Sequence, residues 1–319
     1  MSNRKLLRLS VAICTFNRAA SLARTLKSFA QTRPIALSDW ELLVIDNNST
    51  DATRLVVEQF AGILPLHYHF ESQQGLANAR NRAIAEYCGE LLVFTDDDIL
   101  IGENWLKAYY GALACYPSAG YFGGPIMPCF SAGRPSWLRD ETMPLISGLI
   151  GHYDLGSESR WYSAVDMHPF GANFALRRKL VDSLGFFETE LGVRGEVPGR
   201  SEEAEYFSRA TKQGFSGYYL AEARCQHCVQ PSHLRLGFLY RYGVQKGLAA
   251  GRMGKLHPRR QKHEARNLAM GAASGNCLKG VPTDGDKVLS MLNTSRTGKG
   301  QFVGSPRRSN GKCPVMSSL

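Results

Sequence analysis

The chain has 319 residues with a formal net charge of +10, and its contents of 44% apolar and 21% charged residues are ordinary for a globular protein. It is long enough for one large α/β domain with an appendage, and it has neither an apolar run long enough for a membrane span nor a signal-peptide cleavage pattern. Eight cysteines without the spacing of a disulfide framework predict a reducing, cytoplasmic location.

The first half of the chain alternates strand and helix patterns. Strands are expected at residues 9–14, 40–45, 66–70 and 90–95. Helices are expected at residues 20–29, 75–87 and 103–113, and another is expected to begin after the capping residues 49–51 and to run through residue 60. This alternation predicts right-handed βαβ units and a mainly parallel sheet flanked by helices.

Three consecutive aspartates, Asp96, Asp97 and Asp98, come directly after the strand expected at residues 90–95. Ligands of open α/β sheets bind at the carboxyl ends of the strands. Three carboxylates crowded there repel one another unless a hard cation such as Mg²⁺ or Mn²⁺ shares them. A single acid in this place would more often begin a turn or cap a helix. For three we predict a site that holds a metal ion and a diphosphate.

The regular alternation ends near residue 120. Glycine-, serine- and proline-rich segments predict a loop-rich, irregular insertion over residues 120–170. Trp137, Trp161 and Tyr162 lie in it, where they either pack or stack on a sugar or lipid. Order is expected to return at residues 170–177, with helices after it at residues 179–184 and 201–213.

The second of these helices opens with an acidic cluster. Ser201 as the N-cap, with Glu202 and Glu203 in the first turn, is favourable helix-start chemistry by itself. A functional interpretation is equally available. Neighbouring carboxylates raise one another's pKa, which suits a general base that takes a proton from an alcohol.

Six motifs occur in an order and spacing that resemble family 2 glycosyltransferases with the GT-A fold. They are VAICTFNR (11–18), VIDNNSTDAT (44–53), GLANARNRAI (75–84), LVFTDDD (92–98), FGANFALRR (170–178) and SEEAEY (201–206). The resemblance covers about residues 9–250. It implies an enzyme that moves a sugar from a nucleotide diphosphate to a saccharide or lipid-linked acceptor and inverts the anomeric centre.

The resemblance also implies roles for individual residues on the nucleotide side. Asp46 falls where family members contact the base or ribose, and Thr15, Asn17 and Arg18 would border the same pocket. Arg80 matches the family's Ala-Arg-Asn and would contact the nucleotide. A guanidinium suits that position because it presents several donors in a fixed fork.

The remaining roles concern the acids. In the family's Asp-x-Asp element, Asp96 would face ribose or donor sugar, Asp98 would hold the metal, and the role of Asp97 stays open. Glu203 takes the place of the acidic base, with Glu202 as the alternative. The chain departs from the family here, since it has Ser-Glu-Glu where Gly-Glu-Asp is usual.

The predicted organisation is a GT-A-type, Rossmann-like catalytic domain at residues 1–232. Its nucleotide-binding half lies at about 9–125 and its acceptor half at about 160–232. A basic helical extension is expected at 233–271. The tail at 272–319 has few large apolar residues and is expected to be disordered, because it buries too little surface to offset its ordering entropy.

The segment Cys225-Gln226-His227-Cys228, with His233 nearby, raises two further possibilities. A zinc site would need a second pair of ligands that the sequence lacks. In the resemblance, His227 falls where many GT-A enzymes place a late histidine near the metal or diphosphate. A packed or surface histidine is the alternative.

The positive charge gathers late in the chain. Residues 233–319 hold 16 lysines and arginines against 3 acids, whereas residues 1–232 hold 22 against 25. This basic C-terminal segment is expected either to solubilise the chain or to meet an anionic membrane surface from the cytoplasmic side. No nucleic acid is expected, because no nucleic-acid motif is present. The rival functions are a metal-dependent sugar nucleotidyltransferase and a non-catalytic lipid- or nucleic-acid-binding protein.

Overall fold

The computed structural model describes residues 7–32, 36–164, 166, 168–191, 202–235 and 237–244. The strands are β1 (Leu9–Thr15), β2 (Trp40–Asp46), β3 (Leu66–Phe70), β4 (Leu91–Asp96), β5 (Ile99–Ile101), β6 (Ala119–Gly123), β7 (Ile126–Phe130), β8 (Arg160–Trp161), β9 (Asn173–Arg177), β10 (Ser216–Tyr219) and β11 (Cys225–Val229). The α-helices are α1 (Ala19–Ala30), α2 (Thr53–Phe60), α3 (Leu76–Glu86), α4 (Trp105–Cys115), α5 (Ser147–Ile150), α6 (Arg178–Leu184) and α7 (Glu202–Lys212). Short 3₁₀ turns lie at Leu37–Asp39, Met143–Ile146, Thr189–Leu191 and Pro231–Leu234, and residues 237–244 are also helical.

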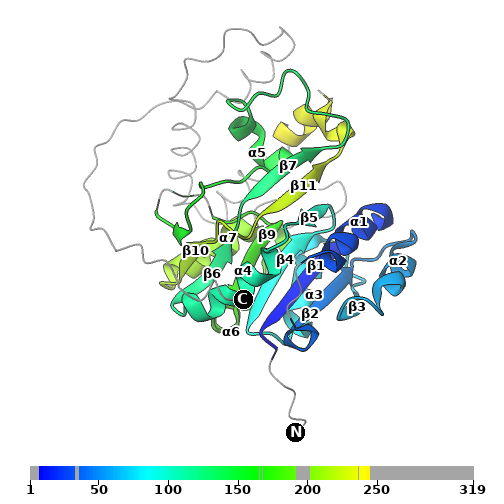
Figure 1. The fold of residues 1–319 in the computed structure, drawn as a ribbon. Coiled ribbons are helices and arrows are strands. Elements are labelled where there is room, and N and C mark those ends of the chain that lie inside the picture. The colour runs from blue at the N-terminus through cyan, green and yellow to red at the C-terminus, as the bar shows by residue number, and fades with distance from the viewer. Residues whose placement is uncertain are drawn as a thin grey trace, which may run out of the picture.

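The large sheet has the strand order β3-β2-β1-β4-β9-β6-β10-β8 (Figure 1). Strands β3, β2, β1 and β4 are parallel, as the βαβ pattern predicts. Strand β9 runs antiparallel between β4 and β6, and β10 is parallel to β6. The carboxyl ends of β1, β2 and β4 therefore meet at one edge, next to the amino end of β9. The expected α/β fold with a mainly parallel sheet is confirmed.

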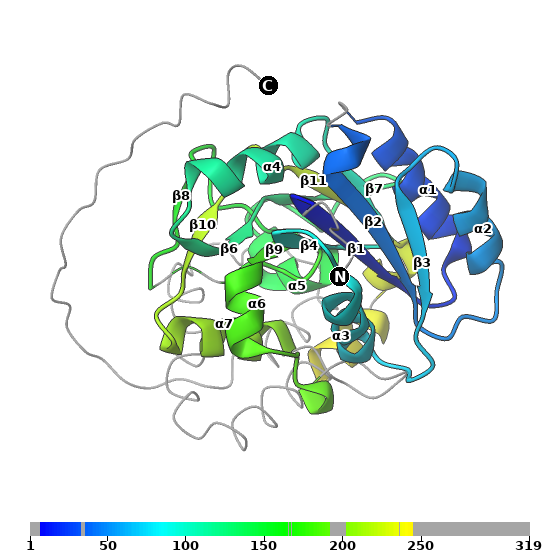
Figure 2. The same cartoon turned by 90° about the horizontal axis from the view of Figure 1, so that it is seen from below.

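Helices cover both faces of this sheet (Figure 2). Alternate strand residues enter separate cores: Val11 and Ile13 of β1 pack with α1, α2 and α4, whereas Ala12 packs with α3, α6 and α7. The central strands are buried on both faces, so they are continuous apolar runs without an amphipathic alternation.

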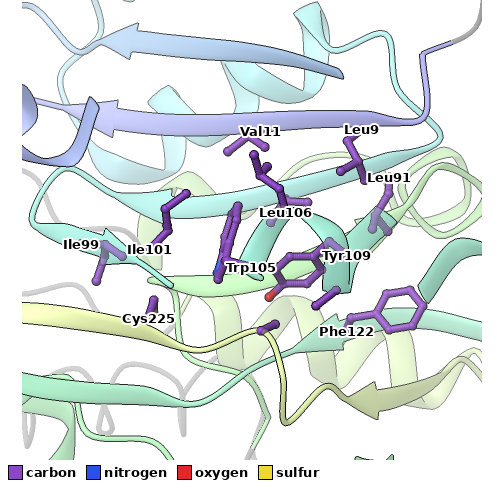
Figure 3. Close-up of a cluster of buried hydrophobic side chains, with 14 of the residues drawn as sticks. Leu9, Val11, Leu91, Ile99, Ile101, Trp105, Leu106, Tyr109, Phe122 and Cys225 are labelled. Atoms are coloured by element: carbon purple, nitrogen blue, oxygen red, sulfur yellow. The ribbon is translucent and has the colours of Figure 1, made fainter. Parts of the chain in front are cut away.

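Helix α4 places Trp105, Leu106 and Tyr109 in the first core (Figure 3), and two of these side chains are hydrogen-bonded to the start of β9. Trp105 packs edge-on against Phe29 and Tyr109, with ring centroids 5.8 Å and 4.9 Å away. The Trp105 Nε1–H and the Tyr109 hydroxyl both donate to Asn173 Oδ1, each at 2.8 Å. The Asn173 amide nitrogen donates in turn to the carbonyls of Pro125 and Ala223. All four bonds of this buried amide are made, so the start of β9 is held firmly beside the end of β4.

A small second sheet, in the order β5-β11-β7, continues from the carboxyl end of β4 (Figure 1). Strand β5 begins directly after Asp98, and the antiparallel pairing of β11 with β5 sets His227 opposite Ile99. A third cluster, formed by buried Leu138, Met143, Ile150 and Val229, packs beside β11.

One expectation about the elements is wrong in detail. Residues 120–170 are not irregular throughout, because most of β6 and all of β7 and β8 lie there, and β6 belongs to the large sheet. Strand β6 has glycine at two of its five positions, and β7 contains Pro128, so local propensity does not predict them. Helix α2 starts at Thr53, after the predicted capping residues 49–51, and the Thr53 backbone N–H donates to Asp51 Oδ1 at 3.0 Å.

The aromatic residues of the predicted insertion pack inside the protein. Trp161 and Tyr162 contact the first core, and Trp137 contacts the third cluster. Ser201 and residues 245–319 lie outside the described residues, so the expected N-cap, most of the basic extension and the tail do as well. Within the described residues, no helix combines the length and the apolarity that crossing a bilayer requires.

Candidate functional site

The aspartate triplet stands where the central strands end. Asp96 is the last residue of β4 and pairs in register with Cys14 of β1. Asp97 and Asp98 form the turn into β5, and their residues are only 3% and 6% exposed. The predicted gathering of carboxylates at the carboxyl edge of the sheet is therefore present.

Residues of the β1–α1 segment bind Asp97. The Thr15 hydroxyl donates to Asp97 Oδ2 at 2.8 Å, and the Thr25 hydroxyl donates to the Asp97 carbonyl at the same distance. Arg18 reaches both Asp97 and Asp98, with Nη1 2.9 Å from Asp97 Oδ1 and Nη2 2.6 Å from Asp98 Oδ2. The guanidinium thus bridges two carboxylates at the start of α1.

His227 approaches Asp98 from the small sheet. Its Nε2 lies 3.4 Å from Asp98 Oδ2, and its Nδ1 lies 2.9 Å from the carbonyl oxygen of Ile150. The backbone N–H of Cys228 donates to the Asp98 carbonyl at 2.9 Å. Asp98 Oδ1 is buried and has no hydrogen-bond partner among the described residues. One oxygen of this carboxylate is therefore bonded, while the other has no partner among the described residues.

The three acids have different pKa values. Burial and the neighbouring Asp98 charge raise the pKa of Asp96. Burial raises the pKa of Asp97 to about 7, although Arg18 opposes this shift. Burial also opposes ionisation of Asp98, but His227 and Arg18 outweigh it and hold that pKa well below its usual range. Burial lowers the pKa of His227, yet Asp98 raises it above its ordinary value. Asp98 is the fixed anion of the cluster.

A second cluster of acidic side chains, formed by Glu202 and Glu203, lies at the start of α7. Arg80 of α3 places Nη1 3.0 Å from Glu202 Oε1 and Nη2 2.8 Å from Glu203 Oε1. The side chain of Glu202 is 1% exposed and that of Glu203 is 16% exposed. Burial raises the pKa of Glu203, but the Arg80 charge outweighs it and lowers the pKa below 4.5. Asp96 feels the charges of both Arg80 and Glu203, which connects the two groups.

Gly171 allows this second group to form. A Cβ atom built on Gly171 would lie 2.2 Å from Glu203 Oε1 and 2.5 Å from Arg80 Nη2, closer than any side chain tolerates. The glycine lets the loop before β9 pass directly over the ion pair, and a larger residue would force these side-chain ends to move. No role for Gly171 is predicted from the sequence, although the Phe-Gly-Ala-Asn motif contains it.

The remaining predicted residues lie on the loops after β1 and β2. Asp46 is buried, and it accepts hydrogen bonds from the Ser49 backbone N–H and the Tyr68 hydroxyl at 2.9 Å and 2.8 Å. Asn17 has a φ of 51° and accepts a bond from the Thr50 backbone N–H at 2.7 Å. These contacts join the two loops beside the carboxylate cluster.

The donor atoms do not form a complete metal cage. Within the described residues, no three His, Cys, Asp or Glu side chains are arranged to hold a metal ion. The zinc hypothesis fails because Cys225 and Cys228 lie on β11, where residues three apart point to opposite faces. A site with one or two protein ligands suits Mg²⁺ or Mn²⁺, which keep waters and bind substrate phosphates.

Comparison with known proteins agrees with this architecture. The family model described as glycosyl transferase family 2 matches residues 10–185. The succinoglycan biosynthesis protein ExoM of Rhizobium meliloti (strain 1021) is 26% identical over 282 residues, covering 85% of this chain and 83% of that protein. The glycosyltransferase AglE of Haloferax volcanii is 35% identical over 227 residues, covering 70% and 67%.

A solved structure supports the fold independently. The mannosyltransferase PcManGT from Pyrobaculum calidifontis, solved in complex with GDP-Man and Mn2+, has a TM-score of 0.53 at 19% identity. The match covers 89% of this chain and 68% of that one. Because the family model spans more than half of the chain, the protein belongs to glycosyl transferase family 2 and is a glycosyltransferase.

Proposed function

We propose that this protein is an inverting glycosyltransferase that moves a sugar from a nucleotide diphosphate to a hydroxyl group of a saccharide or lipid-linked acceptor. The observation that carries the proposal is the pair of acidic groups at one sheet edge, Asp98 beside His227 and Glu203 beside Arg80. An inverting transfer needs a place for the leaving diphosphate and one base. The name of the R. meliloti relative favours polysaccharide or glycoconjugate synthesis.

Asp98 and His227 are the residues that would hold a divalent metal. Asp98 Oδ1 is buried and free of hydrogen bonds to the described residues, and the Nδ1 of His227 faces a carbonyl, which leaves Nε2 for a ligand. The complex of PcManGT with GDP-Man and Mn2+ supports the choice of donor class and metal. When bound, Mg²⁺ or Mn²⁺ would neutralise charge on the departing phosphates.

The nucleotide would lie over the joined loops after β1 and β2. Thr15, Asn17, Arg18 and Asp46 would border the nucleotide there, and Asp96 would face the ribose or donor sugar. Arg80 would border the nucleotide from α3. Its guanidinium is bound to both glutamates, so we also assign it the positioning of Glu203.

Glu203 is the better candidate for the base. Its carboxylate is partly exposed, whereas Glu202 is almost completely buried, and the base has to reach the acceptor. Glu203 accepts the proton of the acceptor hydroxyl as that oxygen bonds to the anomeric carbon. The bond from this carbon to the diphosphate oxygen breaks on the opposite face, and its electron pair leaves with the diphosphate. No second carboxylate nucleophile is required.

The reaction class can be tested without knowing the acceptor. A panel of uridine-, guanosine- and deoxythymidine-diphosphate sugars with Mn²⁺ identifies the donor, because a ligand of the native state raises its melting temperature. With that donor, we expect metal-dependent release of the nucleoside diphosphate. Release of pyrophosphate would identify a nucleotidyltransferase instead, and the absence of both stabilisation and release would favour a binding protein.

Glu203→Gln tests the base. This change keeps the size and hydrogen bonding of the side chain but removes the proton acceptor, so kcat should fall by about 10²–10⁴. Donor affinity, measured by calorimetry, should stay near the wild-type value because the base serves the acceptor. Glu202→Gln is the matched control, and a larger loss from it than from Glu203→Gln would reassign the base.

A further inference from the structure

Among the described residues, the guanidinium of Arg18 is one cation in direct contact with the aspartate cluster. Arg18 contacts Asp97 at 2.9 Å and Asp98 at 2.6 Å, and these are short, charge-assisted contacts. Asp98 is only 6% exposed, and a charge buried in this way is costly unless it is paired. The guanidinium therefore takes over part of the charge balance that a bound cation would otherwise supply.

A divalent metal and Arg18 compete for the same carboxylate. Asp98 Oδ2 already receives Arg18 and faces His227, and both groups favour its negative charge. A metal on Asp98 would place two more positive charges beside the guanidinium and the imidazole in a poorly solvated place. Like charges a few ångströms apart in such a place repel one another strongly, because little water is present to screen them.

The Arg18 side chain lies where it can turn from the aspartates into solvent. Its side chain is 36% exposed, whereas the Asp97 and Asp98 side chains are 4% and 7% exposed. Its backbone stays fixed, because the Arg18 carbonyl accepts the N–H groups of Ser21 and Leu22 at the start of α1. When the side chain swings into solvent, Asp97 still has the hydroxyl of Thr15 as a partner.

We propose that Arg18 is an internal counter-ion of the metal site, which holds Asp98 in the absence of metal and is displaced when the metal binds. The inference rests on the proposed metal site at Asp98. It gives the apoprotein a stable aspartate cluster, and it weakens binding of the metal alone. The metal would then bind best together with a diphosphate, whose negative charge offsets the crowding of cations.

Mn²⁺ binding without nucleotide tests the proposal, with free Mn²⁺ measured by electron paramagnetic resonance. Arg18→Gln removes the competing cation, so its affinity for Mn²⁺ should rise about tenfold, which corresponds to the loss of one charge-assisted hydrogen bond. Arg18→Lys keeps the charge but loses the two-pronged contact, so its Mn²⁺ affinity should lie between those of the wild type and Arg18→Gln. Arg160→Gln is the control, because Arg160 on β8 has a side chain of similar exposure, 34%, and pairs with a different carboxylate, Asp166, at 2.7 Å. Its Mn²⁺ affinity should match the wild type.

The outcomes separate the inference from the proposed function. If Asp98→Asn lowers Mn²⁺ affinity while Arg18→Gln leaves it unchanged or lowers it, Arg18 is not a competing counter-ion and the inference fails alone. If Asp98→Asn binds Mn²⁺ like the wild type, the metal assignment itself fails. The wild-type protein gives a further check with diamagnetic Mg²⁺. The Arg18 Nε signal in nuclear magnetic resonance should shift towards that of a solvated arginine on titration, and an unchanged signal would overturn the displacement.

Discussion

At the scale of single residues, Gly171 leaves the space that the Arg80–Glu203 ion pair occupies. Gly171→Ala places a Cβ 2.2 Å from Glu203 Oε1, so the Arg80–Glu203 pair has to move. We expect kcat to fall at least about tenfold, because a shift of about 1 Å in a positioned group costs rate steeply. Donor affinity should change little. Gly62→Ala is the control, since that position has open space, and equal activity of the two variants would contradict the role of Gly171.

The pH dependence of kcat/KM identifies the side chain whose ionisation the reaction requires. The base works when deprotonated, and the Arg80 charge holds the Glu203 pKa below 4.5 despite burial. Activity, measured as kcat/KM, should therefore persist as pH falls and drop only below the ordinary glutamate range. Asp97 has a pKa of about 7 because burial disfavours its charge. A loss of kcat/KM centred near pH 7 would instead assign the essential ionisation to Asp97 or to His227, whose pKa Asp98 raises above its ordinary value.

At the scale of elements, Asn173 joins α4, β9 and the segment before β11. Asn173→Ala leaves Trp105, Tyr109 and two carbonyls without their partner in a buried place. Each unsatisfied buried group costs about 1–3 kcal/mol, so the free energy of unfolding should fall by at least about 3 kcal/mol in urea titrations. Asn78→Ala removes one exposed 3.3 Å bond and should change stability by less than about 0.5 kcal/mol. Similar losses for both variants would contradict a joining role for Asn173.

At the scale of the whole molecule, the charge is divided along the chain. Residues 1–232 carry a net charge of −3 and residues 233–319 carry +13. Each lysine or arginine near an anionic membrane contributes about 1 kcal/mol, and salt screens the attraction within about 10 Å at 0.1 M. We expect the intact protein to sediment with phosphatidylserine-containing vesicles at low salt and to be released at high salt.

A truncation separates the contributions of residues 233–266 and 272–319 to vesicle binding. Deleting residues 272–319 should weaken vesicle binding only in part, because residues 233–266 hold 9 lysines and arginines against 1 acid. Donor binding should survive the deletion, since every residue assigned to it lies upstream. An intact protein that ignores anionic vesicles even at low salt would favour a soluble acceptor.

The sequence alone determined the elements with strong local patterns. The runs of β1, β2 and β4 are apolar on both faces, and the helices between them have helical periodicity, so the parallel sheet and its acidic edge were predictable. The placement of Asp96, Asp97 and Asp98 at that edge was predictable too, because a strand's carboxyl end is a fixed position in such folds. Strands β5, β6, β7, β10 and β11 were not predictable, because each has only three to five residues and so short a run has no clear period.

Only the tertiary structure decided which side chains meet. Arg18 lies 80 positions before Asp98, and Arg80 lies 122 positions before Glu202, so no local rule pairs them. The same holds for Gly171, whose need to be glycine arises from an ion pair between α3 and α7. Sequence patterns determine secondary structure because hydrogen bonding and burial repeat locally, whereas ion pairs are selected by the packing of elements that are distant in the chain.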